Sequence, residues 1–533
     1  MVRGGTPPLV QGDGDIESWC QREGTRGGAF ALVGVDALAD VAIAVPNLTR
    51  IEPVYWGEND AYIVVGTRAL LVHCVLSGER LPRYDLDSLA SFLAGGFFAG
   101  EDIPFRGVRL APADMAVVVE RGKVRLTPTT DVLQNVSTEE PSNETYDELA
   151  SAFQGSFDPL RGAGQAIQVG LTGGKDSRLL CAGLKAAGVP FSTFIVDYGA
   201  ANAADVHASS LVARAMGVEH DVRSRSGRAQ STRHVQSVDL LQRVRDTLFV
   251  TDGMLSGYEN VPRRRGRYST TLNLGGNGGE LLRGGYAKSY KANSREDVRS
   301  VLVSNFGRFN EYVRAEHAAK HAAFLEDWID EQPADLGPPA LLDRFYLFYR
   351  CGRWSAAARA GMGTCQDMFQ PLFDNRLIGT VQSLPLEPRL DDRLVYEMLR
   401  RLVPEVAGIP LAHGHWLFTS PEERAAERQA YPQLYEKPET SRAKGPNLDW
   451  RTRFATQLRD EFELQIFRGP AADQLFDVLD RDRLRQLFES EDMRNPANRV
   501  FLFAVYTLSV LLSNEWLEEH SVGRAIEVDT VLP

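Results

Sequence analysis

The spacing of hydrophobic residues changes once along the chain. Up to about Leu126, short apolar runs alternate with Gly, Asp and Asn, as in GAFALVGVD, PVYWGEND, AYIVVGT, ALLVHCVL and MAVVVERGKVRL. Such runs are typical of β-strands joined by turns. The polar, proline-containing stretch that follows, TPTTDVLQNVSTEEPSN, is typical of a linker. We therefore predict a β-rich domain over residues 1–130, a linker over 131–145 and a second domain over 146–533.

The second domain begins with alternating strands and helices. AIQVGL and FSTFIVDYG are short apolar strands, and each precedes a segment with apolar residues at helical spacing, DSRLLCAGLKAAG and DVHASSLVARAMG. This order predicts a parallel α/β sheet. After about Ser300 the pattern is mostly helical, with NRVFLFAVYTLSVLL as one of the clearest segments. The expected fold class is therefore α/β with added helices, behind a β-rich N-terminal domain.

Composition and charge narrow the class of protein. The 533 residues are 43% hydrophobic and 24% charged, which is typical of a soluble globular protein of two or three domains. The net charge of −12 argues against a surface built to bind nucleic acid. The run from Val500 to Leu512 is shorter than the ~20 apolar residues of a membrane span. We expect a buried core helix there, and neither a membrane nor a nucleic-acid partner.

The cysteines and the N-terminus indicate the compartment. The five cysteines form no CxxC pair, which favours free thiols in a reducing environment. The N-terminal stretch MVRGGTPPLVQGDGD contains no apolar signal segment. We predict a cytoplasmic protein.

The stretch VGLTGGKDSRLL, from Val169 to Leu180, leads from a buried strand into a helix. Gly173 and Gly174 allow the backbone to approach a ligand, and the helix start offers free N–H groups at the positive end of its dipole. The pattern is neither GxxxxGK[ST] nor GxGxxG. A carboxylate within an anion site, Asp176, indicates Mg²⁺ held against phosphate oxygens. The alternative is that the Asp and Ser of this turn only cap the helix.

A second glycine-dense turn follows about a hundred residues later. The stretch LNLGGNGGELLRGGYAKSY, from Leu272 to Tyr290, joins an apolar strand to a turn with a single acid, Glu280. Glycine is costly to order, so this density is hard to explain by folding alone. We expect a ligand at this turn too.

Together, the two turns resemble the asparagine synthetase family. LTGGKDS resembles the pyrophosphate-binding PP-loop, SGGxDS, of the N-type ATP pyrophosphatases, and LGGNGGELLRGGY resembles the second family signature, roughly LSGEGxDExxGGY. The resemblance implies ATP and Mg²⁺ as cofactors, with Asp176 and Glu280 as metal ligands. The predicted ATP- and pyrophosphate-binding residues are Leu171, Thr172, Gly173, Gly174, Lys175, Asp176, Ser177, Ile195, Val196, Gly276 and Asn277. Lys175 occupies the variable position of the motif, and solvent or a nearby acid is the alternative to its phosphate contact.

The sequence departs from the family pattern at three places. Glu280 occupies the position of a family Asp, and Leu281 replaces the Glu that follows it. The family's first domain is a glutaminase-like Ntn-type β-sandwich with a catalytic N-terminal Cys, but Val2 stands at that position here. The domain therefore resembles the relic found in glutamine-independent members such as β-lactam synthetase and lasso-peptide cyclase.

The third departure concerns the second step of the reaction. Relatives carry a Lys soon after an LLPxxI run, whereas LVPEVAGIPLAHGHW here contains no lysine and places two histidines, His413 and His415, in that neighbourhood. The histidines are candidates for acid–base chemistry or adenylate contacts, and no third ligand completes a metal site. Lys437 and Lys444 lie on a nearby Gly/Pro-containing loop.

The acceptor side of the site is expected in VTDGMLSGYEN, before the second turn, where relatives place acceptor-substrate contacts. The predicted catalytic residues are Asp252, Tyr258, His413 and Lys444. For Asp252 and Tyr258 the alternative is a helix-cap or packing role. For Lys444 the alternative is a side chain that only faces solvent. Asp205 and Asp374 are expected to cap helices.

These observations predict an AMP-forming ligase that adenylates a small-molecule or peptide carboxylate and joins it to an amine. The product is an amide, lactam or isopeptide in specialised biosynthesis, made without glutamine hydrolysis. Three alternatives remain: an ammonia-dependent asparagine synthetase, a nucleotide-binding pseudoenzyme, and an adenylating enzyme of sulfur transfer, against which the absence of CxxC counts. The sequence leaves the substrates, the replacement for the family Lys, and a homodimer or pathway partner protein open.

Overall fold

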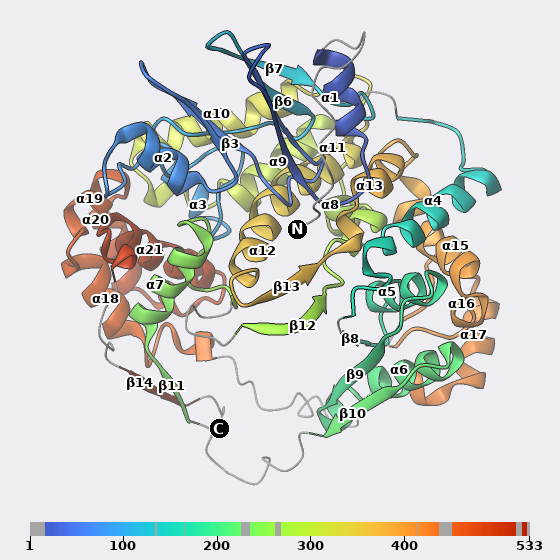
Figure 1. The fold of residues 1–533 in the computed structure, drawn as a ribbon. Helices are drawn as coiled ribbons and strands as arrows, with labels where there is room; N and C mark the ends of the chain where they lie inside the picture. The colour runs from blue at the N-terminus through green and yellow to red at the C-terminus, as the bar shows by residue number, and fades with distance from the viewer. Residues whose placement is uncertain are drawn as a thin grey trace.

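The structure, a computed structural model, describes residues 16–133, 136–164, 166–224, 235–261, 268–412, 414–435, 450–518 and 525–529. It is a mixed α/β protein in which antiparallel strands of the N-terminal region lie above a parallel sheet in Figure 1. Helices surround both. The α/β class predicted from the sequence is confirmed.

The N-terminal strands form two antiparallel sheets, in the orders β1-β2-β6-β7 and β4-β3-β5. Their bounds are β1 (Ala31–Asp36), β2 (Val41–Pro46), β3 (Tyr55–Glu58), β4 (Ile63–Gly66), β5 (Arg109–Leu110), β6 (Met115–Glu120) and β7 (Lys123–Pro128). The β-rich start is as predicted from the turns between apolar runs. The Ntn-type assignment and the domain boundaries at 130 and 145 remain predictions.

One predicted strand was wrong. The run ALLVHCVL lies in a helix, α2 (Ala69–Ser77), which ends at Gly78 in the left-handed conformation with φ +66°. A short apolar run is compatible with a buried helix as well as with a strand, because neither period is visible in it. The glycine that ends the helix was the available signal.

The second half contains the predicted parallel sheet, in the order β10-β9-β8-β12-β13. Its strands are β8 (Ile167–Gly170), β9 (Ser192–Asp197), β10 (His220–Ser224), β12 (Ser269–Leu274) and β13 (Gln366–Phe369). Strands β8 and β12 are neighbours although about a hundred residues separate them in the chain. The segments that follow them therefore lie at the same edge of the sheet.

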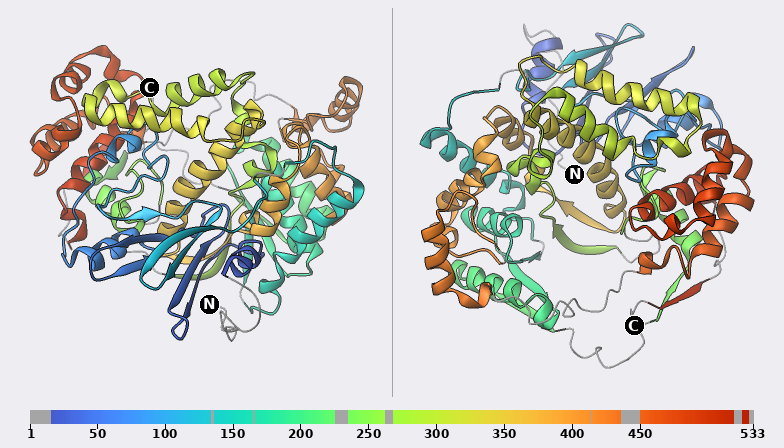
Figure 2. Two further views of the ribbon diagram at one scale, coloured as in Figure 1. Left: turned by 90° about the horizontal axis from the view of Figure 1, so that it is seen from above. Right: turned by 180° about the vertical axis from the view of Figure 1, so that it is seen from behind.

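Helices cover the sheet and fill both sides of the molecule. Figure 2 shows, from behind, β12 and β13 in the middle, with helices α18–α21 on one side and α5, α6 and α15 on the other. The helices are α1 (Ile16–Gly24), α3 (Leu89–Phe92), α4 (Asn143–Gly155), α5 (Lys175–Ala186), α6 (Ala203–Met216), α7 (Leu240–Thr251), α8 (Gly285–Ser289), α9 (Arg295–Phe306), α10 (Ala315–Asp330), α11 (Pro338–Phe345), the π-helix η6 (Tyr346–Ser355), α12 (Ala356–Met362), α13 (Asn375–Gln382), α14 (Glu387–Leu390), α15 (Arg393–Leu402), α16 (Pro404–Ala407), α17 (Pro421–Ala430), α18 (Arg459–Arg468), α19 (Ala472–Val478), α20 (Arg481–Glu489) and α21 (Asn498–Leu512). A separate pair, β11 (Val235–Val238) and β14 (Ile526–Asp529), is antiparallel.

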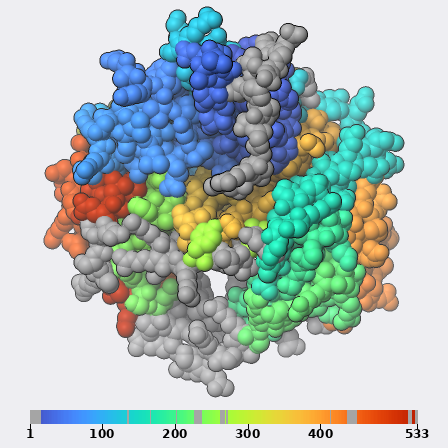
Figure 3. All heavy atoms as spheres, in the orientation of Figure 1, coloured from blue at the N-terminus to red at the C-terminus, as the bar shows by residue number. Residues whose placement is uncertain are grey.

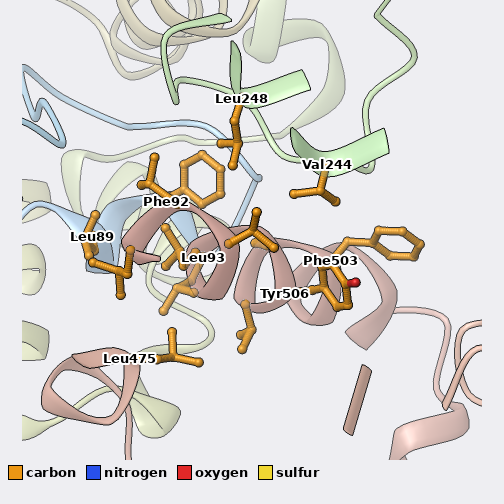
Figure 4. Packing of buried hydrophobic residues seen from close by; sticks show 14 of the residues in the cluster. Leu89, Phe92, Leu93, Val244, Leu248, Leu475, Phe503 and Tyr506 are labelled. Carbon is orange, nitrogen blue, oxygen red and sulfur yellow. The ribbon is translucent and has the colours of Figure 1, made fainter. Parts of the chain in front are cut away.

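The largest hydrophobic core joins the two halves of the chain. Leu89, Phe92 and Leu93 of the N-terminal region pack with side chains of α7, α19 and α21, as Figure 4 shows. The blue N-terminal segment borders the red C-terminal helices on one side of the molecule (Figure 3). Relative placement of the two halves is thus determined by shared apolar packing.

Helix α21 is the buried core helix predicted for the longest apolar run. Its residues from Phe501 to Leu512 are all buried inside that core. In the part of the chain that the structure describes, no helix is long and apolar enough to cross a membrane.

Candidate active site

The two glycine-rich turns touch each other at the carboxyl edge of the parallel sheet. The first follows β8 and the second follows β12, its neighbour. A Cβ added to Gly279 would lie 2.2 Å from Cγ of Asp176, so the backbone of the second turn packs directly against the carboxylate of the first. Gly276 lies beside the same residue, because a Cβ added to it would be 3.6 Å from Cβ of Asp176. Glycine is required at residue 279 for this approach.

The first turn is held in shape by its own polar groups. The Thr172 N–H donates to Oγ of Ser177 (3.1 Å), and the Gly174 N–H donates to Oγ1 of Thr172 (3.3 Å). The Gly173 N–H donates to Oδ1 of Asp205 (3.0 Å). The turn is therefore closed before any ligand binds, which lowers the entropic cost of binding.

Asp205 does not cap its helix as predicted. Asn202 precedes α6, and Asp205 lies in the first turn of that helix with its carboxylate on Gly173. The Asp205 carboxylate thus bonds to the first glycine turn in place of capping its own helix. A local sequence pattern cannot indicate such a contact between distant segments. Asp374, by contrast, caps α13 as predicted, because its Oδ1 accepts from the N–H groups of Arg376 and Leu377.

Helix α5 begins directly in the first turn and has no side-chain cap. Gly174 is the residue before the helix, and as a glycine it has no side chain that could cap the helix start. Asp176 and Ser177 are inside the first turn of the helix, so the alternative that they only cap it does not apply. An uncapped helix start has free N–H groups and a partial positive charge, and it is suited to an anion such as phosphate.

A buried carboxylate fastens the two turns together. Asp392, which precedes α15, is fully buried and accepts from the ammonium groups of both Lys175 and Lys288. Lys175 belongs to the first turn, and Lys288 lies in α8 just after the second. Burial lowers the pKa of Lys175, and Asp392 opposes that shift. Lys175 therefore forms an ion pair at the edge of the site, and its contact with a phosphate remains a prediction.

Arg283, in the second turn, forms an ion pair with Asp176 of the first. Arg283 donates from Nη2 to Oδ2 of Asp176 (2.7 Å) and from Nε to the carbonyl of Gly279 (3.3 Å). Burial raises the pKa of Asp176, Arg283 opposes that rise, and the nearby charge of Glu280 adds to it. Asp176 and Glu280 are therefore electrostatic neighbours.

The acids of the two turns fit a magnesium ion bound together with phosphate. Within the described ranges, no three His, Cys, Asp or Glu side chains are grouped to hold a metal by themselves. Mg²⁺ is commonly bound by one or two carboxylates with substrate phosphates and water completing its shell. Asp176 and Glu280 supply two carboxylates beside an anion site, so the donor set fits that arrangement.

The comparison with known families decides the assignment. The family model described as asparagine synthase matches residues 163–518, which is more than half of the chain. The chain belongs to the asparagine synthase family. No curated protein matches it. Family membership indicates an ATP-dependent amide-forming ligase, because enzymes of this family use ATP, typically with Mg²⁺.

The residues predicted to contact the nucleotide lie along the same edge of the sheet. Leu171 is fully buried, and its N–H donates to the carbonyl of Phe194 (2.9 Å). Ile195 and Val196 are inside β9, where the Val196 carbonyl accepts from Nδ2 of Asn202 (2.8 Å). Asn277 is exposed at the tip of the second turn. The adenine and phosphate contacts of these residues remain predictions.

The acceptor-side residues lie outside the two turns. Asp252 follows α7 in the left-handed conformation, with φ +52°, and binds Arg68 through two hydrogen bonds of 2.5 and 2.6 Å. Tyr258 packs edge-on against Phe503, with ring centroids 5.5 Å apart. These are the cap and packing roles that the sequence left as alternatives, and a substrate contact of either residue remains a prediction.

Two predicted catalytic residues, His413 and Lys444, lie outside the described residues, as does Lys437. His415 is described: it stacks on Tyr435 with ring centroids 5.7 Å apart, and burial lowers its pKa, with Arg428 adding to the shift. Both effects disfavour the protonated form of its imidazole. The next residue, Trp416, lies 5.5 Å from the ammonium of Lys175, which places this segment beside the first turn.

Gly279→Ala should weaken nucleotide binding by at least about tenfold, because its methyl group must displace either the Asp176 carboxylate or the second turn. Isothermal titration with a non-hydrolysable ATP analogue and Mg²⁺ measures the change. Gly379→Ala is the matched control, since a Cβ on that helical glycine has open space around it. Equal affinities of the two variants would show that the turns do not form the nucleotide site.

Proposed function

We propose that this protein is an AMP-forming ligase that adenylates a carboxylate and joins it to an amine in a specialised biosynthetic pathway. The observation that carries this proposal is the direct contact between the two glycine turns at Asp176. The Mg²⁺ and ATP used by the family fit the acids and the uncapped helix at that contact. A cytoplasmic location and a small-molecule or peptide substrate accompany the proposal.

The residues of the site are suited to stabilising a departing pyrophosphate. The N–H groups at the start of α5, with Thr172 and Ser177, would hold phosphate oxygens. Asp176 and Glu280 would hold Mg²⁺, which neutralises charge on phosphate oxygens when it is bound. Arg283 would exchange Asp176 for a phosphate oxygen, and Lys175 adds positive charge at the same edge.

The N-terminal region supports a reaction that does not use glutamine. Cys20, in α1, is fully buried in a small hydrophobic core. Burial raises the pKa of the Cys20 thiol to about 11. A buried thiol with such a pKa is not a nucleophile at neutral pH. The amine would then come directly from the second substrate.

A pseudoenzyme is the second candidate, because one observation favours it. Arg283 already neutralises Asp176, and Leu281 removes the second acid of the family pair. A protein of this kind would bind nucleotide without turnover. An ammonia-dependent asparagine synthetase has no comparable support, since its Lys is missing from the run after Pro404.

The products formed from ATP test the proposal. We would incubate the protein with Mg·ATP, a panel of carboxylates and hydroxylamine, which traps acyl-adenylates, and quantify the nucleotides by chromatography. The proposal expects AMP and pyrophosphate in equal amounts and a hydroxamate with the correct acid. ADP and phosphate would overturn it, and aspartate with ammonium giving asparagine would establish the primary-metabolic alternative. Nucleotide binding with no product across the panel would favour the pseudoenzyme.

A further inference from the structure

Residues 409–412 and 414–416, here called the His415 segment, lie directly against the first glycine turn. The Ala412 N–H donates to the carbonyl of Gly173 (3.1 Å), and a Cβ added to Gly173 would collide with Cβ of Ala412. Leu411 and Trp416 are buried in the hydrophobic core that includes side chains of β8. The segment belongs to the stretch LVPEVAGIPLAHGHW, which contains no lysine where relatives of the family carry one.

Arg178 connects the His415 segment to α5. Its side chain is fully buried, and its Nη2 donates to the carbonyl of Pro410 (2.8 Å). Its Nη1 donates to the carbonyls of Ile409 and, at 3.4 Å, Val406. One guanidinium thus binds three carbonyls at the end of α16, where the last carbonyls of a helix have no helical partner. Arg178 directly follows Ser177, which is predicted to bind phosphate, so the start of α5 lies between the predicted phosphate site and this segment.

The guanidinium of Arg178 is a costly group to bury. Its hydrogen-bond partners in the described part of the chain are carbonyls only, and its buried Nε has none there. Burial lowers the pKa of Arg178 to about 10, and Glu427 opposes that shift, so the side chain is charged at neutral pH. A nonpolar side chain of similar volume would fill the space without desolvating a charge. We therefore assign the role of Arg178 to the carbonyls that it holds in place.

The His415 segment in turn fixes the shape of the first glycine turn. Both peptide groups of Gly173 are bound, because its N–H donates to Asp205 (3.0 Å) and its carbonyl accepts from Ala412 (3.1 Å). Arg178 holds Pro410, two residues before Ala412. Order in the segment and the binding of an anion at the turn should therefore stabilise each other, since coupling between two sites is reciprocal.

We propose that Arg178 is a positioning residue that holds the His415 segment on the first glycine turn and thereby couples the order of this segment to nucleotide binding. The inference rests on the proposed function only in that the anion at the turn is a nucleotide. In the proposed ligase, the segment that lacks the family's second-step lysine would then be ordered while the nucleotide is bound, before the amine reacts.

Hydrogen–deuterium exchange of the full chain, measured by mass spectrometry on peptides that cover residues 404–418, tests this proposal. The variant is Arg178→Met, which has a side chain of similar length without a hydrogen-bond donor. The matched control is Arg295→Met, because Arg295 also donates to three carbonyls, within the segment 329–333. None of those carbonyls belongs to a glycine turn or to the His415 segment.

Without nucleotide, peptides that contain Ala412 should exchange at least about tenfold faster in Arg178→Met than in the wild-type protein, and at the wild-type rate in Arg295→Met. With α,β-methylene-ATP and Mg²⁺, whose binding is titrated in parallel, their exchange should slow in the wild-type protein and not in Arg178→Met. If circular dichroism showed that Arg178→Met does not fold, Arg178→Lys would give the comparison. Lysine keeps the charge but lacks the planar fork, so a smaller acceleration is expected.

Wild-type exchange at Ala412 in the Arg178 variants would overturn the proposal, because apolar packing alone would then hold the segment. An acceleration spread equally over the whole chain would also overturn it, since Arg178 would then serve only global stability. So would a nucleotide that binds the wild-type protein without slowing exchange over residues 404–418. If no nucleotide bound, the ligase proposal would fail, and the comparison without nucleotide would still decide whether Arg178 holds the segment.

Discussion

Asp176→Asn should weaken the binding of an ATP analogue with Mg²⁺ by about a hundredfold, because it removes the more buried of the two carboxylates proposed to hold the metal. Binding of the same analogue in the presence of a chelator should change much less. Titrations with α,β-methylene-ATP, with and without Mg²⁺, give both affinities. A loss of affinity that occurs only when Mg²⁺ is present would identify Asp176 as a metal ligand. A residue that only shapes the turn would lower the affinity in both titrations.

Asp158→Asn is the control for this experiment. Asp158 is an exposed acid before β8, paired with Arg161 at 3.1 Å, so its replacement changes the net charge equally without reaching the glycine turns. If the two variants bound the magnesium-containing nucleotide as tightly as the wild-type protein does, Asp176 would not be a metal ligand.

Asp392→Asn should lower the free energy of unfolding by about 3 kcal/mol. The substitution leaves the ammonium groups of Lys175 and Lys288 partly buried without their shared counter-ion. Asn tolerates the left-handed backbone at this position, where φ is +70°, so the change isolates the charge. Denaturant titration followed by circular dichroism measures the difference.

The neighbouring residue gives the matched comparison. Asp391 pairs with Arg393 at 3.1 Å, and a third of its side chain is exposed, so Asp391→Asn should cost about 1 kcal/mol or less. Equal stabilities of the two variants would show that the lysines find other partners. The two glycine turns would then not depend on a buried carboxylate for their relative position.

The sequence predicted the elements whose signal is local. The change from strand-like runs to alternating strands and helices predicted the parallel sheet. The two glycine turns marked two segments that the structure brings into contact, and a ligand between them remains a prediction. Family membership, which those turns indicated, is confirmed by the asparagine synthase match. Helix α2 was missed because a short apolar run carries no period of its own.

The polar contacts that organise the site were not predictable in the same way. Lys175 and Asp392 are 217 residues apart in the chain, and Arg283 and Asp176 are 107 residues apart. The sequence shows a basic residue, Arg283, within the second glycine turn. Its partner could not be predicted, because that partner depends on which strands become neighbours in the sheet. Asp205 was assigned to a local cap for the same reason, although its carboxylate bonds to Gly173.

A crystal structure with α,β-methylene-ATP and Mg²⁺ would show directly whether the two glycine turns bind one nucleotide. We expect phosphate oxygens within hydrogen-bond distance of the start of α5, and a metal ion between Asp176 and Glu280. Arg283 should have left Asp176 for a phosphate oxygen. A nucleotide bound elsewhere on the molecule, with the Arg283–Asp176 pair intact, would show that the turns are not the nucleotide site.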